Sequence, residues 1–191
     1  MPVTLVSLPN GPIELVLVLT SEPFHAVWTL LETVTDPEIP VVSLREMGIL
    51  RAVRQGSEGL EVVITPTYSG CPAMGQMEDD VKAALAQAGI TARVVTQLAP
   101  AWSTDWMTPQ ARTKLKAYGI APPQVSSCVQ QGFNVIQFSS KKIASQAQPS
   151  VICPQCDSEN TTEISHFGST ACKALYRCLN CLEPFDYFKP Y

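Results

Sequence analysis

Apolar side chains recur at helical spacing in three stretches of the chain. Residues 24–34 predict an amphipathic helix, which ends before Pro37 because a residue that precedes proline is pushed out of the helical conformation. Residues 72–88 predict a second helix with one apolar face. Residues 108–118 predict a third helix, with Pro109 in its first turn.

Three shorter segments have the pattern of strands. Residues 49–55 and 60–65 predict a hairpin, because they flank a short segment bounded by glycines. Residues 93–98 predict a third strand. The order helix, strand, strand, helix, strand describes a small α/β domain whose helices pack against a mixed sheet. The predicted fold class is α+β, with this domain followed by a separate cysteine-rich module.

The same pattern divides the chain into four parts. Residues 1–22 form a leader, read as an extra strand or a loosely attached segment; its apolar run is too short to span a bilayer and lacks the basic start of a signal peptide. Residues 23–120 hold the α/β domain. Residues 121–150 form a connecting segment and linker. Residues 151–191 form the small module, and a piece of about 40 residues usually needs a metal to be stable.

Two Cys-x-x-Cys pairs define that module: Cys153 with Cys156, and Cys178 with Cys181. Each pair can turn two thiolates toward one point, so together they supply the four sulfurs of a tetrahedral metal site. Thiolates favour zinc, or iron in a rubredoxin-like or cluster site, over magnesium or calcium. Two disulfides, or reduced cysteines without metal, are the alternatives, and nothing in the sequence suggests an oxidising compartment.

Composition narrows the class of protein. The chain has 191 residues, is 46% hydrophobic and carries a net charge of −4, which fits a packed globular protein. The segment 151–191 holds five acidic and three basic residues, whereas a nucleic-acid-binding ribbon normally shows a basic face. We therefore expect a cytoplasmic protein that binds neither nucleic acid nor membrane.

Three residues of the first domain are candidates for chemistry. Asp36 and Glu38 lie on a turn stiffened by prolines, where they either project into a site or are solvated acids after a helix. Cys71 precedes Pro72 at the predicted start of a helix. The positive end of the helix dipole there favours thiolate over thiol, which predicts a nucleophile or soft-metal ligand; a buried inert cysteine is the alternative.

These three residues lie on loops at the ends of elements, so they could converge at one end of the sheet. A thiolate beside carboxylates could hold iron, a cluster or a persulfide transiently, which suits a carrier better than a hydrolase. A Cys–His pair would have only His25 and His166 to draw on, and neither has a motif around it.

Longer motifs resemble known families. Residues 36–50 and 65–72 resemble the iron-sulfur assembly domain of SUF-associated factors and of the cytosolic iron-sulfur targeting machinery, a resemblance that covers about residues 24–100. The remainder is similar to the family of D subunits of bacterial phenylacetyl-CoA 1,2-epoxidases, on the segments 99–107, 114–122, 167–178 and 183–189.

This resemblance implies an accessory subunit of a ring-epoxidising oxygenase in aerobic phenylacetate breakdown, beside a di-iron subunit and a reductase subunit with a flavin and a [2Fe-2S] cluster. The implied role is maturation or insertion of iron-sulfur clusters, with structural zinc in the ribbon, transient iron or a cluster in the first domain, and the other subunits, especially the reductase, as partners. The chain has no Glu-x-x-His pair for a di-iron site and no glycine-rich nucleotide motif, so it is not expected to be the catalyst. The alternative is a structural or electron-transfer subunit with redox-active iron in the ribbon.

Several positions depart from the pattern or have open roles. Asp157 and Leu182 stand where such ribbons usually carry glycine, and because leucine tolerates a left-handed backbone poorly, the second knuckle is expected to be looser. Cys172 is a substitute ligand, a redox partner or a packing residue; packing is favoured because four sulfurs already close a zinc site. Cys128 is assigned no role. The aromatic residues Trp102, Trp106, Phe185, Tyr187 and Phe188 form either a contact surface or core.

Overall fold

The computed structural model describes residues 24–124 and 150–191. The predicted leader at 1–22, most of the predicted connecting segment at 121–150, and Cys128 lie outside the described residues. Among the helices within the described ranges, none has the length and apolar character that crossing a membrane requires.

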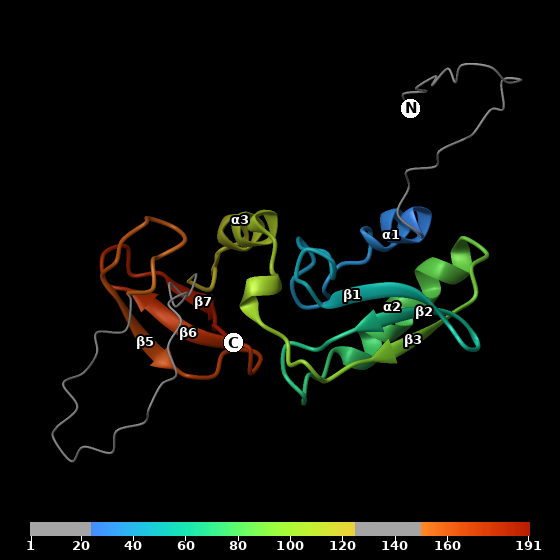
Figure 1. Cartoon of the computed structure of the whole chain (residues 1–191). Helices are drawn as coiled ribbons and strands as arrows, with labels where there is room; N and C mark the ends of the chain where they lie inside the picture. Colours follow the sequence, from blue (N-terminus) through green and yellow to red (C-terminus); the bar gives the residue numbers. More distant parts are fainter. Residues whose placement is uncertain (1–23, 125–149) are drawn as a thin grey trace, which may run out of the picture.

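The first domain has the predicted order of elements (Figure 1). They are α1 (His25–Leu31), β1 (Leu50–Gly56), β2 (Gly59–Ile64), α2 (Met74–Gln87) and β3 (Ala92–Thr96). The sheet has the order β1-β2-β3, with β1 antiparallel to β2 and β2 parallel to β3. The predicted hairpin and mixed sheet are confirmed.

The remaining elements link this domain to a second sheet. They are the 3-10 helix η1 (Thr104–Trp106), α3 (Pro109–Tyr118), β4 (Ile120–Ala121), β5 (Thr161–Ser165), β6 (Lys173–Cys178) and β7 (Pro184–Phe188). Strands β5, β6 and β7 form an antiparallel ribbon, and β4 adds to β7 in parallel, giving the order β4-β7-β6-β5. Figure 1 shows α3 between the two sheets. The short strand β4 was not predicted, and it ties the end of α3 to the ribbon.

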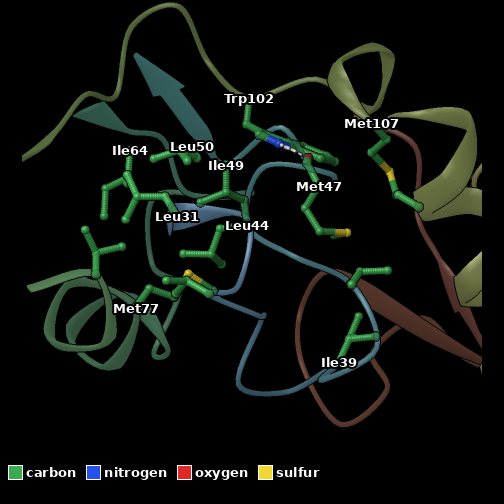
Figure 2. Packing of buried hydrophobic residues seen from close by; sticks show 14 of the residues in the cluster. Leu31, Ile39, Leu44, Met47, Ile49, Leu50, Ile64, Met77, Trp102 and Met107 are labelled. Atoms are coloured by element: carbon green, nitrogen blue, oxygen red, sulfur yellow. Dashed lines mark hydrogen bonds between the residues drawn. The ribbon is translucent and has the colours of Figure 1, made fainter. Parts of the chain in front are cut away.

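The main core lies inside the first domain. In Figure 2 the side chains of Leu31, Leu44, Ile49 and Met77 gather beside α2, and all four are at most 2% exposed. Their burial holds α1, the sheet and α2 together, at about 25 cal/mol for each Å² of apolar surface removed from water. A smaller cluster, which includes Phe185 and the buried cysteines of the ribbon, forms the core of the C-terminal module.

Aromatic residues join the two modules. The indole of Trp102 donates a hydrogen bond to the main-chain oxygen of Met47 at 3.1 Å (Figure 2). Its ring centroid lies 5.9 Å from that of Phe188 and 6.2 Å from that of Tyr191. Trp102 and Phe188 are 4% and 1% exposed, and both belong to the core cluster of the first domain. Trp102 and Phe188 are therefore core residues and not an exposed contact surface.

Candidate metal centre and thiol site

The four cysteines of the two knuckles come together as predicted. The sulfurs of Cys153, Cys156, Cys178 and Cys181 all lie within 4.8 Å of one another. The Cys153 and Cys181 sulfurs are 3.8 Å apart, and the Cys156 and Cys178 sulfurs are 3.6 Å apart. A tetrahedral ion with metal–sulfur bonds of about 2.3 Å separates its sulfurs by about 3.8 Å. The set therefore fits a single thiolate-bound metal ion.

Backbone hydrogen bonds shape both knuckles in the same way. The N–H of Cys153 donates to the carbonyl of Ser158 at 2.9 Å, and the N–H of Cys178 donates to the carbonyl of Glu183 at 3.0 Å. The N–H groups of Asn180 and Cys181 each lie 3.4 Å from the Cys178 sulfur. Such N–H groups stabilise the negative charge of a thiolate ligand.

Left-handed residues complete the two turns. Asp157 has φ 57° and Leu182 has φ 67°, so both positions adopt the conformation for which glycine is the usual choice. The second knuckle nevertheless closes with the same backbone hydrogen bond as the first. The expected loosening of the second knuckle stays a prediction, and the cost of the left-handed backbone falls on Leu182.

Asp36 shapes the turn that follows α1. Its carboxylate oxygen Oδ1 accepts hydrogen bonds from the N–H groups of Glu38 at 2.8 Å and Ile39 at 3.0 Å. Burial raises the pKa of Asp36; those two hydrogen bonds oppose the rise, the charge of Glu38 adds to it, and Lys173 lowers it. Asp36 is only 6% exposed, so the alternative of a solvated acid is wrong for this residue.

Glu38 is the other carboxylate of this turn. Its side chain is half-buried, and within the described residues no hydrogen bond or ion pair engages its carboxylate. Unlike Asp36, it is available to a ligand.

Cys71 lies before α2, not at its first residue. The helix begins at Met74 with Ala73 as its N-cap, and the N–H of Cys71 donates to the carbonyl of Tyr68 at 3.2 Å. Burial raises the pKa of the Cys71 thiol; the charges of Cys172, Glu38 and Asp36 raise it further, and a hydrogen bond from Ala73 lowers it. Burial and the acidic neighbours thus favour the thiol over the predicted thiolate.

The loop that carries Cys71 also holds a buried polar group. Thr65, at the end of β2, is 1% exposed, and its hydroxyl has no hydrogen-bond partner among the described residues. Its main-chain N–H is bound to the carbonyl of Ile49 at 2.8 Å, which anchors the start of the loop to the sheet.

Asp36 and Glu38 influence Cys71 electrostatically, but the three side chains do not gather into a metal-ligand group among the described residues. The charges of Glu38 and Asp36 act on the thiols of both Cys71 and Cys172. In the sequence, Cys172 is a fifth cysteine close to the two Cys-x-x-Cys pairs. No sequence pattern connects it with the loop that carries Cys71, which lies far earlier in the chain. The ribbon also supplies Lys173, which is 5% exposed and whose charge lowers the pKa of Asp36.

The two histidines lie apart from these residues. His25 is the first residue of α1 and is exposed. His166 is exposed as well, with its Nδ1 atom 3.4 Å from a carboxylate oxygen of Glu163. Within the part of the chain that the structure describes, neither is paired with a cysteine, which agrees with the absence of a motif around them.

Comparison with known proteins identifies both modules. A family model described as "Iron-sulfur cluster assembly protein" matches residues 25–96, and one described as "PaaD zinc beta ribbon domain" matches residues 137–189. The chain thus combines an α+β domain of the iron-sulfur assembly class with a C-terminal module of the zinc-ribbon class.

A relative covers nearly the whole length. The putative D subunit of the 1,2-phenylacetyl-CoA epoxidase of Escherichia coli (strain K12) is 49% identical over 166 residues, which are 86% of this chain and 92% of the relative. The chain therefore belongs to the family of the phenylacetyl-CoA epoxidase D subunits, PaaD.

Other similarities concern the first domain. A "Fe-S protein maturation auxiliary factor" of Porphyromonas gingivalis (strain ATCC BAA-308 / W83) is 33% identical over 89 residues, which are 45% of this chain and 84% of the relative. A crystal structure of a "Domain of Unknown Function DUF59" from Bacillus anthracis is 28% identical, with a TM-score of 0.44, and the match covers 48% of this chain and 89% of that one.

Proposed function

We propose that this chain is an accessory subunit of a phenylacetyl-CoA epoxidase and that it matures or inserts the iron-sulfur cluster of a partner subunit. One observation carries the proposal: the half-buried Cys71 thiol, whose pKa the charges of Glu38 and Asp36 help to raise, lies in a domain that matches the iron-sulfur assembly family. Because the chain belongs to the D-subunit family, we expect it to act within the phenylacetyl-CoA epoxidase complex.

The residues of this site have separable tasks in the proposal. Cys71 supplies a soft sulfur ligand, and Glu38 supplies a carboxylate that no other described group occupies. Asp36 is a positioning residue, because its Oδ1 atom holds the N–H groups that shape the turn carrying Glu38. The cargo is iron or an iron-sulfur cluster, which is held here transiently and passed on.

In the ribbon we propose a structural zinc ion. Four thiolates close a tetrahedral shell and leave no open position for substrate, which is the pattern of structural zinc sites. The same four sulfurs also suit iron, so the alternative of an electron-transfer subunit rests on this site. Purified protein that is colourless and carries one zinc ion would exclude that alternative, whereas visible absorption from ribbon-bound iron would favour it.

The proposed partners are the other subunits of the epoxidase, above all the reductase subunit with its [2Fe-2S] cluster. The proposed location is the cytoplasm, where reducing conditions keep thiols available for metal. No role at a membrane or on nucleic acid is part of the proposal.

The test measures iron and acid-labile sulfide in the reductase and di-iron subunits, purified from cells with and without this chain. We expect the reductase subunit to lose its cluster without the chain, and Cys71→Ser to reproduce that loss. Ser69→Ala, an exposed position on the same loop, serves as the control and should leave the cluster content unchanged. Full iron and sulfide in the absence of the chain would contradict the maturation role.

A further inference from the structure

The hairpin between β6 and β7 ends in an exposed tip at the ribbon metal centre. The N–H of Cys178 donates to the carbonyl of Glu183 at 3.0 Å, which closes the loop 179–182. Leu179 and Leu182 stand at the two ends of this loop, and their side chains are 48% and 58% exposed. The second knuckle thus presents two leucines to solvent beside its metal-ligating cysteines.

The first knuckle adds a third exposed apolar side chain, that of Ile152, which is 45% exposed. The hydroxyl of Thr161 donates to the carbonyl of Val151 at 2.6 Å, and the N–H of Leu179 donates to the carbonyl of Asn160 at 2.8 Å. The first knuckle and the tip of the hairpin are therefore bound to the same short segment. We call the three exposed residues at this end of the ribbon the knuckle patch: Ile152, Leu179 and Leu182.

Leu182 occupies a position for which glycine is the usual choice. Its φ of 67° is left-handed, and no burial of its side chain within the described residues offsets the conformational cost. Single exposed apolar residues are ordinary on protein surfaces, but a residue held in a costly conformation is often one that serves a function. The cost at Leu182 therefore distinguishes the knuckle patch from scattered apolar exposure.

The surroundings of the knuckle patch are negatively charged. Glu159 and Glu183 are exposed and adjoin the patch along the chain, and within the described residues neither carboxylate forms an ion pair. Arg177 is the neighbouring cation, and its Nε atom donates to a main-chain carbonyl of the second knuckle at 3.3 Å. Lys116 of α3 is already ion-paired with Asp157. Four thiolates exceed the charge of a divalent ion, so the metal-loaded centre adds to the negative charge.

We propose that the knuckle patch is a docking surface for a partner protein that offers an apolar pocket bordered by Lys and Arg side chains. The apolar side chains of the patch fill the pocket, and the basic border complements the acids and the anionic metal centre. This inference rests on the proposed function, in which the partner is the reductase subunit that receives the cluster. Nucleic acid and anionic membrane surfaces do not fit, because the patch carries their own sign of charge.

The test measures binding of the full, zinc-loaded chain to the purified reductase subunit by biolayer interferometry. Leu182→Gly removes an exposed side chain and relieves the left-handed backbone, so a loss of binding in this variant does not come from unfolding. We expect it to weaken binding at least about tenfold, as truncation of an interface anchor does, while its metal content and melting temperature equal or exceed those of the wild type. Leu179→Ser should weaken binding as well.

The matched control is Ile164→Ser. Ile164 is 53% exposed and lies on β5, outside the knuckle patch, so this variant should bind like the wild type. Wild-type binding by Leu182→Gly would overturn the inference, and so would equal losses in Ile164→Ser and Leu179→Ser. A wild-type chain that does not bind the reductase subunit, or that instead forms a dimer abolished by Leu182→Gly in light scattering, would also overturn it.

Salt and a charge variant test the basic border of the partner. Association of the wild-type chain should slow as ionic strength rises, because salt screens exposed charges. Glu183→Gln should slow association and change dissociation less. Binding that responds to neither change would contradict a partner with a basic border.

The results separate this inference from the maturation role. A reductase subunit that lacks its cluster in cells without the chain, together with wild-type binding by Leu182→Gly, would leave the proposed function standing and overturn only the docking surface. Full cluster content without the chain, together with binding that depends on Leu182, would do the reverse.

Discussion

Leu182 carries a conformational cost that can be removed. Its φ of 67° places a leucine in the left-handed region, and its side chain is 58% exposed, so it buries little in return. The left-handed conformation costs a non-glycine residue roughly 1–2 kcal/mol. Glycine avoids this cost, but its greater conformational freedom in the unfolded chain offsets part of the gain. We expect Leu182→Gly to stabilise the metal-loaded ribbon by about 1 kcal/mol, measured by thermal unfolding and by chelator competition.

The matched control for this change is Leu179→Gly in the same knuckle. Leu179 is 48% exposed, and it is not among the described residues with positive φ. Glycine therefore brings only its entropic cost there, and stability should fall slightly. Equal effects from the two variants would contradict a specific cost at Leu182.

Asp36 offers a prediction about pH. Burial raises its pKa in the folded chain above the ordinary value of 3.8. The folded state therefore keeps the proton to higher pH than the unfolded state does, so wild-type stability declines as pH rises from the unfolded pKa through the folded one. Asp36→Asn keeps an oxygen for the two N–H donors and does not titrate. Urea unfolding between about pH 4 and pH 7 should show the variant gaining stability relative to the wild type.

The companion variant separates the charge of Asp36 from its hydrogen bonds. Asp36→Ala leaves the N–H groups of Glu38 and Ile39 without their side-chain acceptor, and a buried polar group without a partner costs about 1–3 kcal/mol. It should be less stable than the wild type at both ends of the pH range. A pH-independent difference between Asp36→Asn and the wild type would rule out the buried charge.

At the scale of the element, α3 is defined by local signals at both ends. The hydroxyl of Thr108 accepts a hydrogen bond from the N–H of Ala111 at 3.1 Å, and Pro109 occupies the first turn. Gly119 ends the helix with φ 94°, a left-handed conformation for which glycine is suited. These features depend on neighbours in sequence, which is why the helix at 108–118 could be predicted to within a residue.

The cap of α3 can be tested directly. Thr108→Ala removes an N-cap oxygen and should cost about 1 kcal/mol in urea unfolding. Thr113→Ala, on the exposed face of the same helix, removes a hydroxyl that bonds only to the preceding turn, and should stay within about 0.5 kcal/mol of the wild type. Similar losses in the two variants would contradict the capping role.

Other elements could not be predicted because their stability comes from partners far along the chain. Strand β4 has only two residues, Ile120–Ala121, and exists because β7 pairs with it. Helix α1 ends at Leu31, before the predicted residue 34, because the chain then tightens into the turn that Asp36 closes. The periodicity of apolar residues therefore predicts neither strand β4 nor the end of α1.

The candidate sites show the same difference between features set by local sequence and features set by distant parts of the chain. The four ribbon cysteines were predictable because each knuckle brings its own two sulfurs together within four residues. The expected convergence of Asp36, Glu38 and Cys71 stays a prediction: the two carboxylates act on the pKa of Cys71, but the three side chains form no metal-ligand group among the described residues. The position of Cys172 could not be predicted, because only the packing of the ribbon against the first domain places this residue in the core cluster of that domain. The pKa of Cys71 also depends on burial and on charges from distant parts of the chain, which a local helix-dipole argument does not include.

At the scale of the molecule, Trp102 reports on the contact between the modules. Its indole is bound to Met47 of the first domain, and its ring meets Phe188 of the ribbon. Small ribbons held by a metal unfold when the metal is removed. We expect chelation to release Phe188, shift Trp102 emission to the red and lower the melting temperature of the first domain. The measurement uses a variant with Trp102 as its sole tryptophan, beside one with only Trp28 on α1, whose emission should change little.

Phe188→Ala distinguishes loss of the metal from loss of the contact. Phe188 is 1% exposed and lies in the cluster of the first domain, so its truncation should cost about 3–5 kcal/mol while all four metal ligands remain. If the two modules form one cooperative unit, this variant keeps its zinc, yet Trp102 shifts as it does after chelation. Unchanged Trp102 emission after complete metal removal would instead show that the modules are stable independently, and the ribbon would then be an attachment to the first domain with no influence on its core.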